Sequence, residues 1–187
     1  SGSTAISEAW FARLLGLRFV AVMPACTAPG KIRDVQALGG EVDLVDDPAQ
    51  VHARAAEHAA RGACHLDQFT YAERATDWRG NNNIAESIIG QLARERSPEP
   101  HWIVCGAGTG GTSATIGRYL RYRCLHTRLC IADPADSGFV RGWQSNDRGA
   151  VASRPTLIEG IGRPRVEPGF VFEVVDHVIG VPDEASI

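Results

Sequence analysis

Lysine is almost absent from this chain of 187 residues, because Lys31 is the only one among its 19 cationic residues and the rest are arginines. A mechanism that needs a nucleophilic amine therefore has one candidate within the chain. Lys31 falls in an expected helix whose apolar positions, Ile32, Val35 and Leu38, direct it toward solvent. Lysine side chains are mostly exposed, so the expected role of Lys31 is that of a surface charge.

Cysteine pairs, long apolar runs and net positive charge are lacking as well. The five cysteines are odd in number and form no C-x-x-C pair, which excludes a disulfide scaffold and indicates a reducing cytosol. The longest apolar run, residues 19–26, is interrupted by Pro24 and is too short to span a bilayer, and no signal peptide is recognisable at Ser1. A net charge of -3 gives no field that would attract nucleic acid. Small-molecule chemistry is the remaining expectation.

Helix and strand patterns alternate along the chain. Expected helices begin near Ser3 or Thr4, at Pro29, at Pro48, at Ile84 and after Thr112, and expected strands cover residues 18–23, 41–45, 102–105, 128–132 and 172–181, with a shorter one at 64–66. Residues 135–170 show little periodicity. Because parallel strands need crossover connections, the alternation predicts an α/β fold with doubly wound, mostly parallel sheets and helices on both faces.

Two of these helices have complete start signals. Asp47 and Pro48 stand at the cap and first position of one helix, which Gly62 ends. Asn83 is followed by Glu86 three residues later, a variant of the capping box, at the start of the next. A polar loop without clear period, residues 68–82, lies between them, and loops of that length are often functional.

The segment Gly106–Thr112 lies between a strand and a helix, where backbone N–H groups and the helix dipole favour an anion. Thr109 and Thr112 add hydroxyl donors, which favours a phosphate monoester. The spacing also satisfies G-x-G-x-x-G, with Asp133 placed 22 residues after Gly111, so a dinucleotide site of a nicotinamide-dependent oxidoreductase is the alternative. A tight turn without a ligand is the third interpretation. The two hydroxyls favour the monoester. The position of the loop does too, because a dinucleotide motif usually opens its domain and here about a hundred residues precede it.

Five segments carry recognisable motifs. They are the glycine loop Gly108–Thr112 (G-T-G-G-T), the segment Ser1–Thr4 (S-G-S-T), the pair Gln68–Phe69 (Q-F), the turn Gly160–Gly162 (G-I-G) and the stretch Lys31–Val42 (K-I-R-D-V-Q-A-L-G-G-E-V). By itself, the segment at Ser1 would be read as a helix cap. The presence of all five motifs over about 160 residues is more specific than any one of them.

These motifs resemble those of the fold-type II pyridoxal-phosphate enzymes of the cysteine synthase and cystathionine β-synthase family, whose sheets have the tryptophan-synthase-β-like architecture. In that family the G-T-G-G-T loop binds the cofactor phosphate, an S-G-N-T loop binds the substrate carboxylate, and the glutamine of the Q-F pair meets the substrate. The resemblance therefore implies cofactor binding by Gly108, Thr109, Gly110, Gly111, Thr112, Ser3 and Gly160, and substrate binding by Ser1, Gly2, Thr4 and Gln68.

Within the family, residues 1–12 and 68–88 are most similar to the L-cysteine desulfhydrase branch. The resemblance implies elimination from L-cysteine through an aminoacrylate to give sulfide, pyruvate and ammonia, in a cytoplasmic homodimer. Cysteine synthesis from O-acetylserine and sulfide shares the first half of that reaction and stays open, as does a binding protein without cofactor. One departure is Ser3, which replaces the family's asparagine and puts the tuning of the cofactor in question.

The family's Schiff-base lysine lies upstream of the segment that matches Ser1, and the residue that meets the pyridine nitrogen lies beyond the position of Ile187. No catalytic residue is therefore expected within this chain, which is predicted to be a fragment. It is expected to contain a partial N-terminal lobe with the substrate loop, residues 1–97, and a truncated lobe that binds the cofactor phosphate, residues 98–187.

Other candidate residues carry weaker signals. The six histidines have no metal-ligand spacing, so no metal site is expected. Arg163 and Arg165, directly after the G-I-G turn, are interpreted either as a carboxylate site or as a surface patch. Cys105, directly before the glycine loop, is expected to be a buried small apolar residue.

Overall fold

The computed structural model describes residues 2–74, 76–79 and 83–187, and these divide into two compact units, Ser1–Leu66 and Asp67–Ile187. The first unit contains the helices α1 (Gly2–Leu14), α2 (Pro29–Ala37) and α3 (Val51–Ala60), the 3-10 helix η1 (Pro48–Gln50) and the strands β1 (Val20–Pro24) and β2 (Glu41–Val45).

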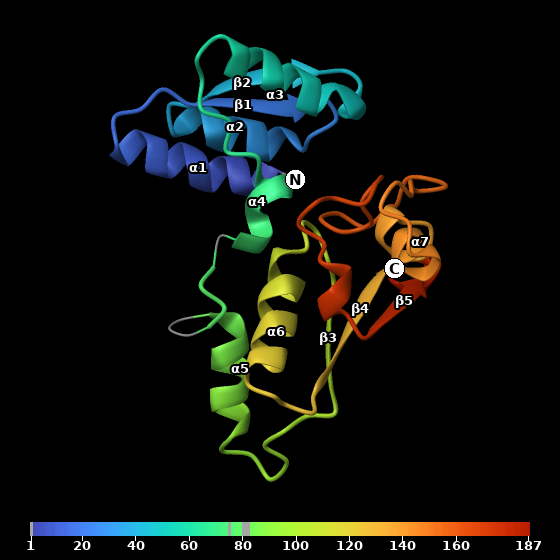
Figure 1. Ribbon diagram of the computed structural model, residues 1–187. Coiled ribbons are helices and arrows are strands. Elements are labelled where there is room, and N and C mark those ends of the chain that lie inside the picture. Colours follow the sequence, from blue (N-terminus) through green and yellow to red (C-terminus); the bar gives the residue numbers. More distant parts are fainter. Residues whose placement is uncertain (1, 75, 80–82) are drawn as a thin grey trace. The chain divides into compact units, whose positions relative to one another are not determined.

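Strands β1 and β2 of the first unit pair in parallel, with Val20 opposite Glu41 and Pro24 opposite Val45. Helices α1 and α2 cover one face of this small sheet and α3 covers the other (Figure 1). The buried core of the unit is made of small and medium apolar residues from α1, β1 and α2, namely Ala9, Ala21, Met23 and Val35. The predicted placement of helices on both faces of a parallel sheet is confirmed in this unit.

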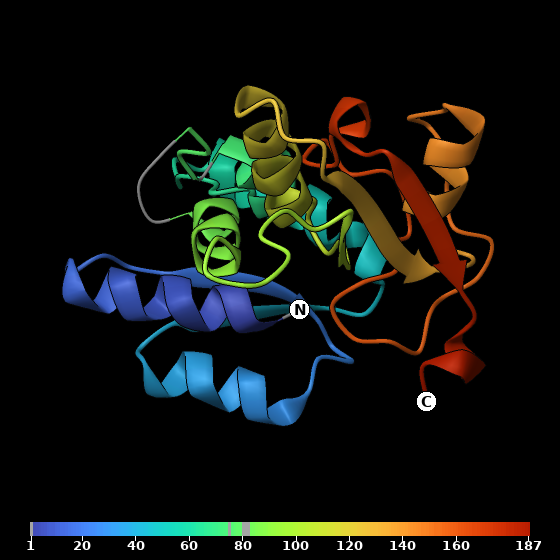
Figure 2. The ribbon, with the colours of Figure 1, turned by 90° about the horizontal axis from the view of Figure 1, so that it is seen from below.

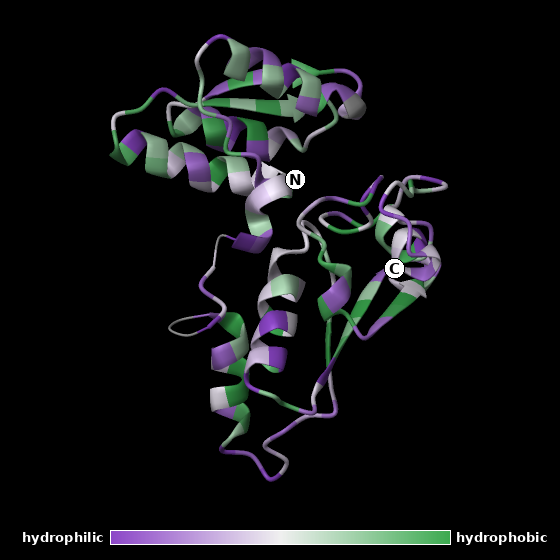
Figure 3. Cartoon of the chain, viewed as in Figure 1, coloured by the Kyte–Doolittle hydropathy of each residue, from purple (hydrophilic) through white to green (hydrophobic). Residues whose placement is uncertain are grey.

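The second unit contains a parallel sheet in the order β3 (Trp102–Cys105), β4 (Arg128–Pro134), β5 (His177–Val181). Its longer helices are α5 (Ile84–Leu92), α6 (Gly111–Tyr122) and α7 (Gly138–Ser145), and its short elements are α4 (Gln68–Tyr71), η2 (Ala72–Arg74), η3 (Phe172–Val174) and η4 (Asp183–Ala185). Helix α5 lies along α6 (Figure 2). The loop between α5 and β3 is largely hydrophilic (Figure 3).

The core of the second unit fills the space between the sheet and helices α6 and α7. Ile116 and Leu120 of α6 and Leu129 and Ile131 of β4 are at most 1% exposed. Phe139 of α7, also fully buried, stacks on Phe170 with a ring-centroid distance of 4.2 Å. The second unit therefore has an apolar core of its own, which gives the loops at the ends of its strands a rigid base.

Most predicted elements are confirmed, but several differ, among them the loop predicted at 68–82, which contains α4 and η2. Residues 64–66 are exposed and form no strand, because no neighbouring strand pairs with them in the described residues. The segment predicted as one strand at 172–181 is divided into η3 and β5 by Asp176, whose carboxylate accepts the N–H of Leu129 at 2.8 Å. Helix α7 lies inside the stretch 135–170, in which the sequence shows little periodicity and no helix was predicted.

The sequence places a lobe boundary at 97/98, whereas the contacts of the structure divide the chain at 66/67. The difference comes from residues 67–97, whose helix α5 packs against α6 of the second unit. Across the described residues, no helix has the length and apolar character needed to cross a bilayer.

The predicted cap of α5 is present, since the Asn83 side chain accepts the N–H of Glu86 at 2.9 Å and donates to the carbonyl of Asp77 at 3.1 Å. Replacing Asn83 with alanine is expected to lower the free energy of unfolding by about 1 kcal/mol. Urea unfolding followed by circular dichroism measures this loss. Asn83→Ser keeps a neutral capping acceptor and is the comparison variant that should lose less stability than alanine. Equal urea midpoints for the alanine variant and the natural chain would contradict a stabilising cap.

Candidate functional site

The glycine loop connects β3 to α6, and its backbone conformation depends on glycine. Gly110 precedes the first residue of α6 with a φ of 88°, in the left-handed region. As the N-cap residue, Gly110 has no side chain with which to cap α6, unlike Asn83 at α5. The first N–H groups of a helix that lacks a capping side chain are suited to an anion, because the helix dipole also favours negative charge at that end.

Threonine and serine hydroxyls in and after the loop have different roles. Thr109 Oγ1 accepts the N–H of Gly111 at 3.3 Å. The hydroxyls of Ser113 and Thr115 donate back to the carbonyls of Gly110 and Gly111, each at 2.9 Å, so they are engaged within the helix. Thr112, at the second position of α6, is exposed. Its hydroxyl is therefore accessible to a ligand, as the sequence predicts.

The G-I-G turn lies directly against the start of the glycine loop. A Cβ placed on Gly108 would come within 2.6 Å of the Gly160 carbonyl oxygen, and one placed on Gly106 would come within 3.2 Å of the Ile161 side chain. Gly160 itself has a φ of 92°. The structure thus brings together the loop and the turn that the sequence assigns to one cofactor.

The far side of the loop meets the segment that follows Gln68. A Cβ on Gly111 would lie 2.8 Å from the Ala72 carbonyl oxygen, and a Cβ on Gly110 would lie 2.5 Å from the Gly169 carbonyl oxygen. Gly169 in turn donates its N–H to the Phe69 carbonyl at 3.0 Å. The sequence analysis missed Gly169, although the Pro-Gly dipeptide at 168–169 is a signal for a tight turn.

These observations fit the phosphate group of a cofactor. Gly108, Gly110 and Gly111 are required because main-chain atoms of Gly160, Gly169 and Ala72 occupy the positions that their Cβ atoms would take, so the loop is packed in place and the start of α6 is fixed. The donors present, helix N–H groups and the Thr112 hydroxyl, suit a phosphate monoester. Groups of three or more His, Cys, Asp or Glu side chains that could hold a metal ion are absent from the described residues.

Asp133, at the end of β4, is 1% exposed and holds the G-I-G turn. Its carboxylate accepts the N–H of Gly162 at 3.2 Å. Burial raises the pKa of this carboxyl to about 6, although hydrogen bonds from Ser137 and Gly162 and the charge of Arg163 oppose the increase. Because Asp133 is buried and bonded within the protein, it is not placed to bind a ribose, which removes the main support for the nicotinamide alternative.

Glu73 attaches η2 to α6 beside the loop. Its buried carboxylate contacts both Arg74, at 2.6 Å, and Arg118, whose guanidinium also donates to the Glu73 carbonyl at 2.8 Å. Burial alone would raise the pKa of Glu73, but the hydrogen bonds and charges of the two arginines outweigh burial and lower the pKa. Glu73 is therefore ionised at neutral pH and fixes the segment that contains Ala72.

Cys105, at the end of β3, is partly buried rather than fully enclosed. Burial, with a smaller contribution from the neighbouring thiol of Cys130, raises its pKa to about 11. The Cys105 side chain is therefore a neutral thiol at physiological pH, and thiols of this kind are poor nucleophiles. This agrees with the expectation of a small apolar residue.

The segment predicted to bind the substrate carboxylate belongs to the first unit. Ser1 lies outside the described residues, and α1 begins at Gly2 rather than at Thr4, so Ser3 and Thr4 belong to its first turn instead of capping it. Gly2 is buried, and a Cβ placed on it would lie 2.9 Å from both the Cβ and the Cδ of Lys31. The aliphatic part of Lys31 thus packs on the start of α1, and Lys31 is half-buried rather than fully exposed.

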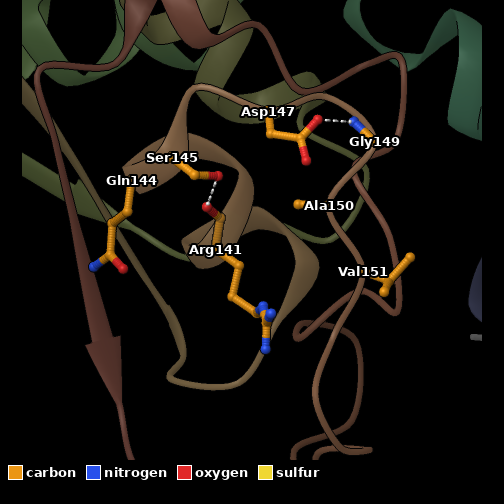
Figure 4. A pocket seen from close by; sticks show the side chains of 7 residues that line it. All are labelled: Arg141, Gln144, Ser145, Asp147, Gly149, Ala150 and Val151. Carbon is orange, nitrogen blue, oxygen red and sulfur yellow. Dashed lines mark hydrogen bonds between the residues drawn. The ribbon is translucent and has the colours of Figure 1, made fainter.

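A surface hollow of about 520 Å³ lies at the end of α7 (Figure 4). Its lining residues are Arg141, Gln144, Ser145, Asp147, Gly149, Ala150 and Val151. The Ser145 hydroxyl donates to the Arg141 carbonyl at 2.7 Å, and Asp147 accepts the N–H of Gly149 at 2.8 Å. These polar groups are therefore bonded within the protein, and the lining contains no residue of the predicted site.

Comparison with known proteins gives consistent matches over the whole chain. A family model described as pyridoxal-phosphate dependent enzyme matches residues 1–187. L-cysteine desulfhydrase Cds1 of Mycobacterium tuberculosis is 57% identical over 188 residues, which cover 100% of this chain and 51% of that protein. Cysteine synthase 2 of Neurospora crassa is 30% identical over 208 residues, covering 99% of this chain and 45% of that protein.

The fold also matches solved structures. A hydrogen sulfide-producing enzyme from Fusobacterium nucleatum superposes with a TM-score of 0.76 at 21% identity, over 97% of this chain and 57% of that one. Isoform 3 of O-acetylserine sulfhydrylase from Entamoeba histolytica superposes with a TM-score of 0.71 at 22% identity, over 97% of this chain and 52% of that one. The chain spans about half the length of the curated relatives it matches.

Proposed function

Since the chain belongs to the family of pyridoxal-phosphate-dependent enzymes, we propose that the protein that carries it releases sulfide from L-cysteine, with pyruvate and ammonia as the other products. The family inferred from the sequence motifs is confirmed, and so is the α/β fold. The observation that carries the proposed activity is the 57% identity to an L-cysteine desulfhydrase, which extends over the whole chain.

The proposed roles of the residues rest on the five sequence motifs and on the geometry of the glycine loop. Gly108–Thr112 bind the cofactor phosphate at the start of α6, and Gly160 lies beside the cofactor. Gln68 meets the substrate. In the first unit, Ser3 contacts the cofactor, and the backbone and hydroxyls of the Ser1–Thr4 segment bind the substrate carboxylate. The lobe of residues 1–97 supplies the substrate loop and the lobe of 98–187 the phosphate site.

Pyridoxal phosphate, when bound, withdraws electrons from the substrate amino acid so that its α proton and β substituent can leave. The chain's own residues orient the reactants. The phosphate contacts fix the position of the ring, and the substrate contacts fix the carboxylate, so the sulfur leaves from a defined geometry. The lysine that binds the cofactor is proposed to lie outside residues 1–187, because Lys31, the one lysine present, packs its stem against Gly2.

Pyruvate release from L-cysteine by the full-length protein tests the proposal. Cysteine formation from O-acetylserine and sulfide is the second candidate, favoured by the 30% identity to a cysteine synthase. Pyruvate without cysteine synthesis supports the desulfhydrase, and cysteine synthesis without pyruvate supports the synthase. Absence of both activities in protein loaded with the cofactor would exclude the two proposals. We also propose a cytoplasmic homodimer, which light scattering on the full-length protein and fractionation of cells would test.

The 187 residues by themselves are expected to produce no pyruvate from cysteine, because they lack the proposed cofactor lysine. The isolated chain is still expected to bind pyridoxal phosphate, since the phosphate loop lies entirely within it. Quenching of tryptophan fluorescence measures this binding. Lys31→Ala serves as the control and should leave this binding unchanged. Pyruvate released by the isolated chain would show that the essential amine is within it.

A further inference from the structure

A buried ion pair fixes Arg163 directly after the G-I-G turn. The Glu167 carboxylate is 0% exposed and accepts a hydrogen bond from Arg163 Nη2 at 2.8 Å. Its other oxygen contacts Arg165 Nε at 3.3 Å. Leaving a buried carboxylate without its partner costs much free energy. The Arg163 guanidinium is therefore held in the position where it pairs with Glu167.

The backbone of Arg163 is fixed as well. Its carbonyl accepts the N–H of Gly138, the first residue of α7, at 2.8 Å. The preceding residue, Gly162, donates its N–H to Asp133 at the end of β4. Arg163 is therefore anchored to the sheet, to α7 and to a buried carboxylate, and its side chain is a rigid support for whatever it contacts.

The Arg163 side chain contacts the ring of Phe69. The guanidinium carbon lies 4.2 Å from the centroid of the Phe69 ring, within the range of a cation–π interaction. Phe69 follows Gln68 in α4, and its carbonyl accepts the N–H of Gly169, which also faces the glycine loop. The segment that carries Gln68 is thus attached at two points, by its backbone at Gly169 and by its ring at Arg163.

We propose that Arg163 is a positioning residue for the elimination: fixed by Glu167, it holds the Phe69 ring and thereby holds Gln68 at the substrate. The proposal rests on the proposed function. Arg163 acts through Phe69 and is not itself a catalytic residue. The carboxylate that it binds is that of Glu167, so the surface-patch interpretation of Arg163 is replaced by a structural role beside the site.

The first test measures pyruvate formation from L-cysteine by the full-length enzyme. Arg163→Met and Phe69→Leu are each expected to raise KM for cysteine about fivefold while kcat stays within about twofold. The double variant should be no worse than either single one, because both remove the same contact. Arg148→Met is the matched control, since Arg148 also pairs with a carboxylate, that of Glu173, and lies 4.5 Å over a ring, that of Phe172. It should leave KM unchanged.

The second test needs no activity. Amide hydrogen exchange of the peptide 67–74, followed by mass spectrometry, is expected to accelerate in Arg163→Met and Phe69→Leu but not in Arg148→Met. Should Arg163→Met fail to fold, Phe69→Leu carries the same expectation, because it leaves the Glu167 pairs intact. If the unmodified enzyme yields no pyruvate, the proposed function fails while exchange still tests the contact. An unchanged KM in an active enzyme, additive effects in the double variant, or unchanged exchange would overturn the role of Arg163.

Discussion

Alanine at position 110 is expected to lower the free energy of unfolding by about 3 kcal/mol and to abolish binding of pyridoxal phosphate. Gly110 has a φ of 88°, which costs a residue with a Cβ about 1–2 kcal/mol. The new Cβ would also lie 2.5 Å from the Gly169 carbonyl oxygen and 2.7 Å from Phe170 Cα. Both are backbone atoms, so the main chain must move to relieve these clashes. That movement adds about 1–3 kcal/mol to the loss of stability.

Urea unfolding measures the loss of stability in Gly110→Ala, and quenching of tryptophan fluorescence measures the loss of cofactor binding. Gly90→Ala is the matched control, because Gly90 lies within α5 and a Cβ there would have no neighbour within 4 Å. Alanine at 90 should raise the free energy of unfolding by about 0.5–1 kcal/mol. A Gly110→Ala protein that keeps its stability and its cofactor affinity would show that the loop tolerates a side chain.

The contribution of Asp133 to the stability of the natural chain is expected to fall by up to about 3 kcal/mol as the pH rises from about 4 to about 6. Its native pKa, about 6, is higher than the ordinary value of 3.8, so the folded chain retains a proton that the unfolded chain has released. Stability from this group is therefore fully present below the unfolded pKa and is lost as the pH rises through the native one.

Asp133→Asn removes this titration, so the variant's stability should not show that decrease. Its side-chain oxygen can still accept the N–H of Gly162. Asp136→Asn is the control. Hydrogen bonds from Ser153 and Arg154 lower the pKa of Asp136, so the stability that Asp136 contributes is lost as the pH falls rather than as it rises. Urea unfolding between pH 4 and 7.5 compares the three proteins. Parallel pH profiles for Asp133→Asn and the natural chain would refute the assignment.

Local signals predicted the elements that local forces determine. The cap at Asn83 and the strand β2 occur as predicted, because a side-chain cap and the β-branched residues Val42 and Val45 act within a few residues. Helix α7 was missed because Gly138 and Gly142 interrupt its pattern. Both are explained by contacts distant in sequence, since a Cβ on Gly142 would lie 2.4 Å from Val166 and one on Gly138 would lie 2.7 Å from Arg165.

Only part of the candidate site could be predicted from the sequence, again because only local patterns are readable there. Its phosphate loop has a contiguous motif, so Gly108–Thr112 could be identified from sequence. Its walls are formed by residues far apart in the chain, such as Ala72 and Gly169, which have no motif of their own. The contact between Arg163 and Phe69 joins residues 94 positions apart, and a single sequence contains no record of such a pairing.

The backbone walls of the glycine loop restrict how this family can diverge. Gly108, Gly110 and Gly111 face carbonyl oxygens of Gly160, Gly169 and Ala72, so the loop is lined by main chain, which every amino acid shares. Two of the facing residues are themselves constrained glycines, since Gly160 has a φ of 92° and a Cβ on Gly169 would lie 2.6 Å from the Thr109 carbonyl oxygen. The glycine loop and the two glycine turns that face it can therefore change only together.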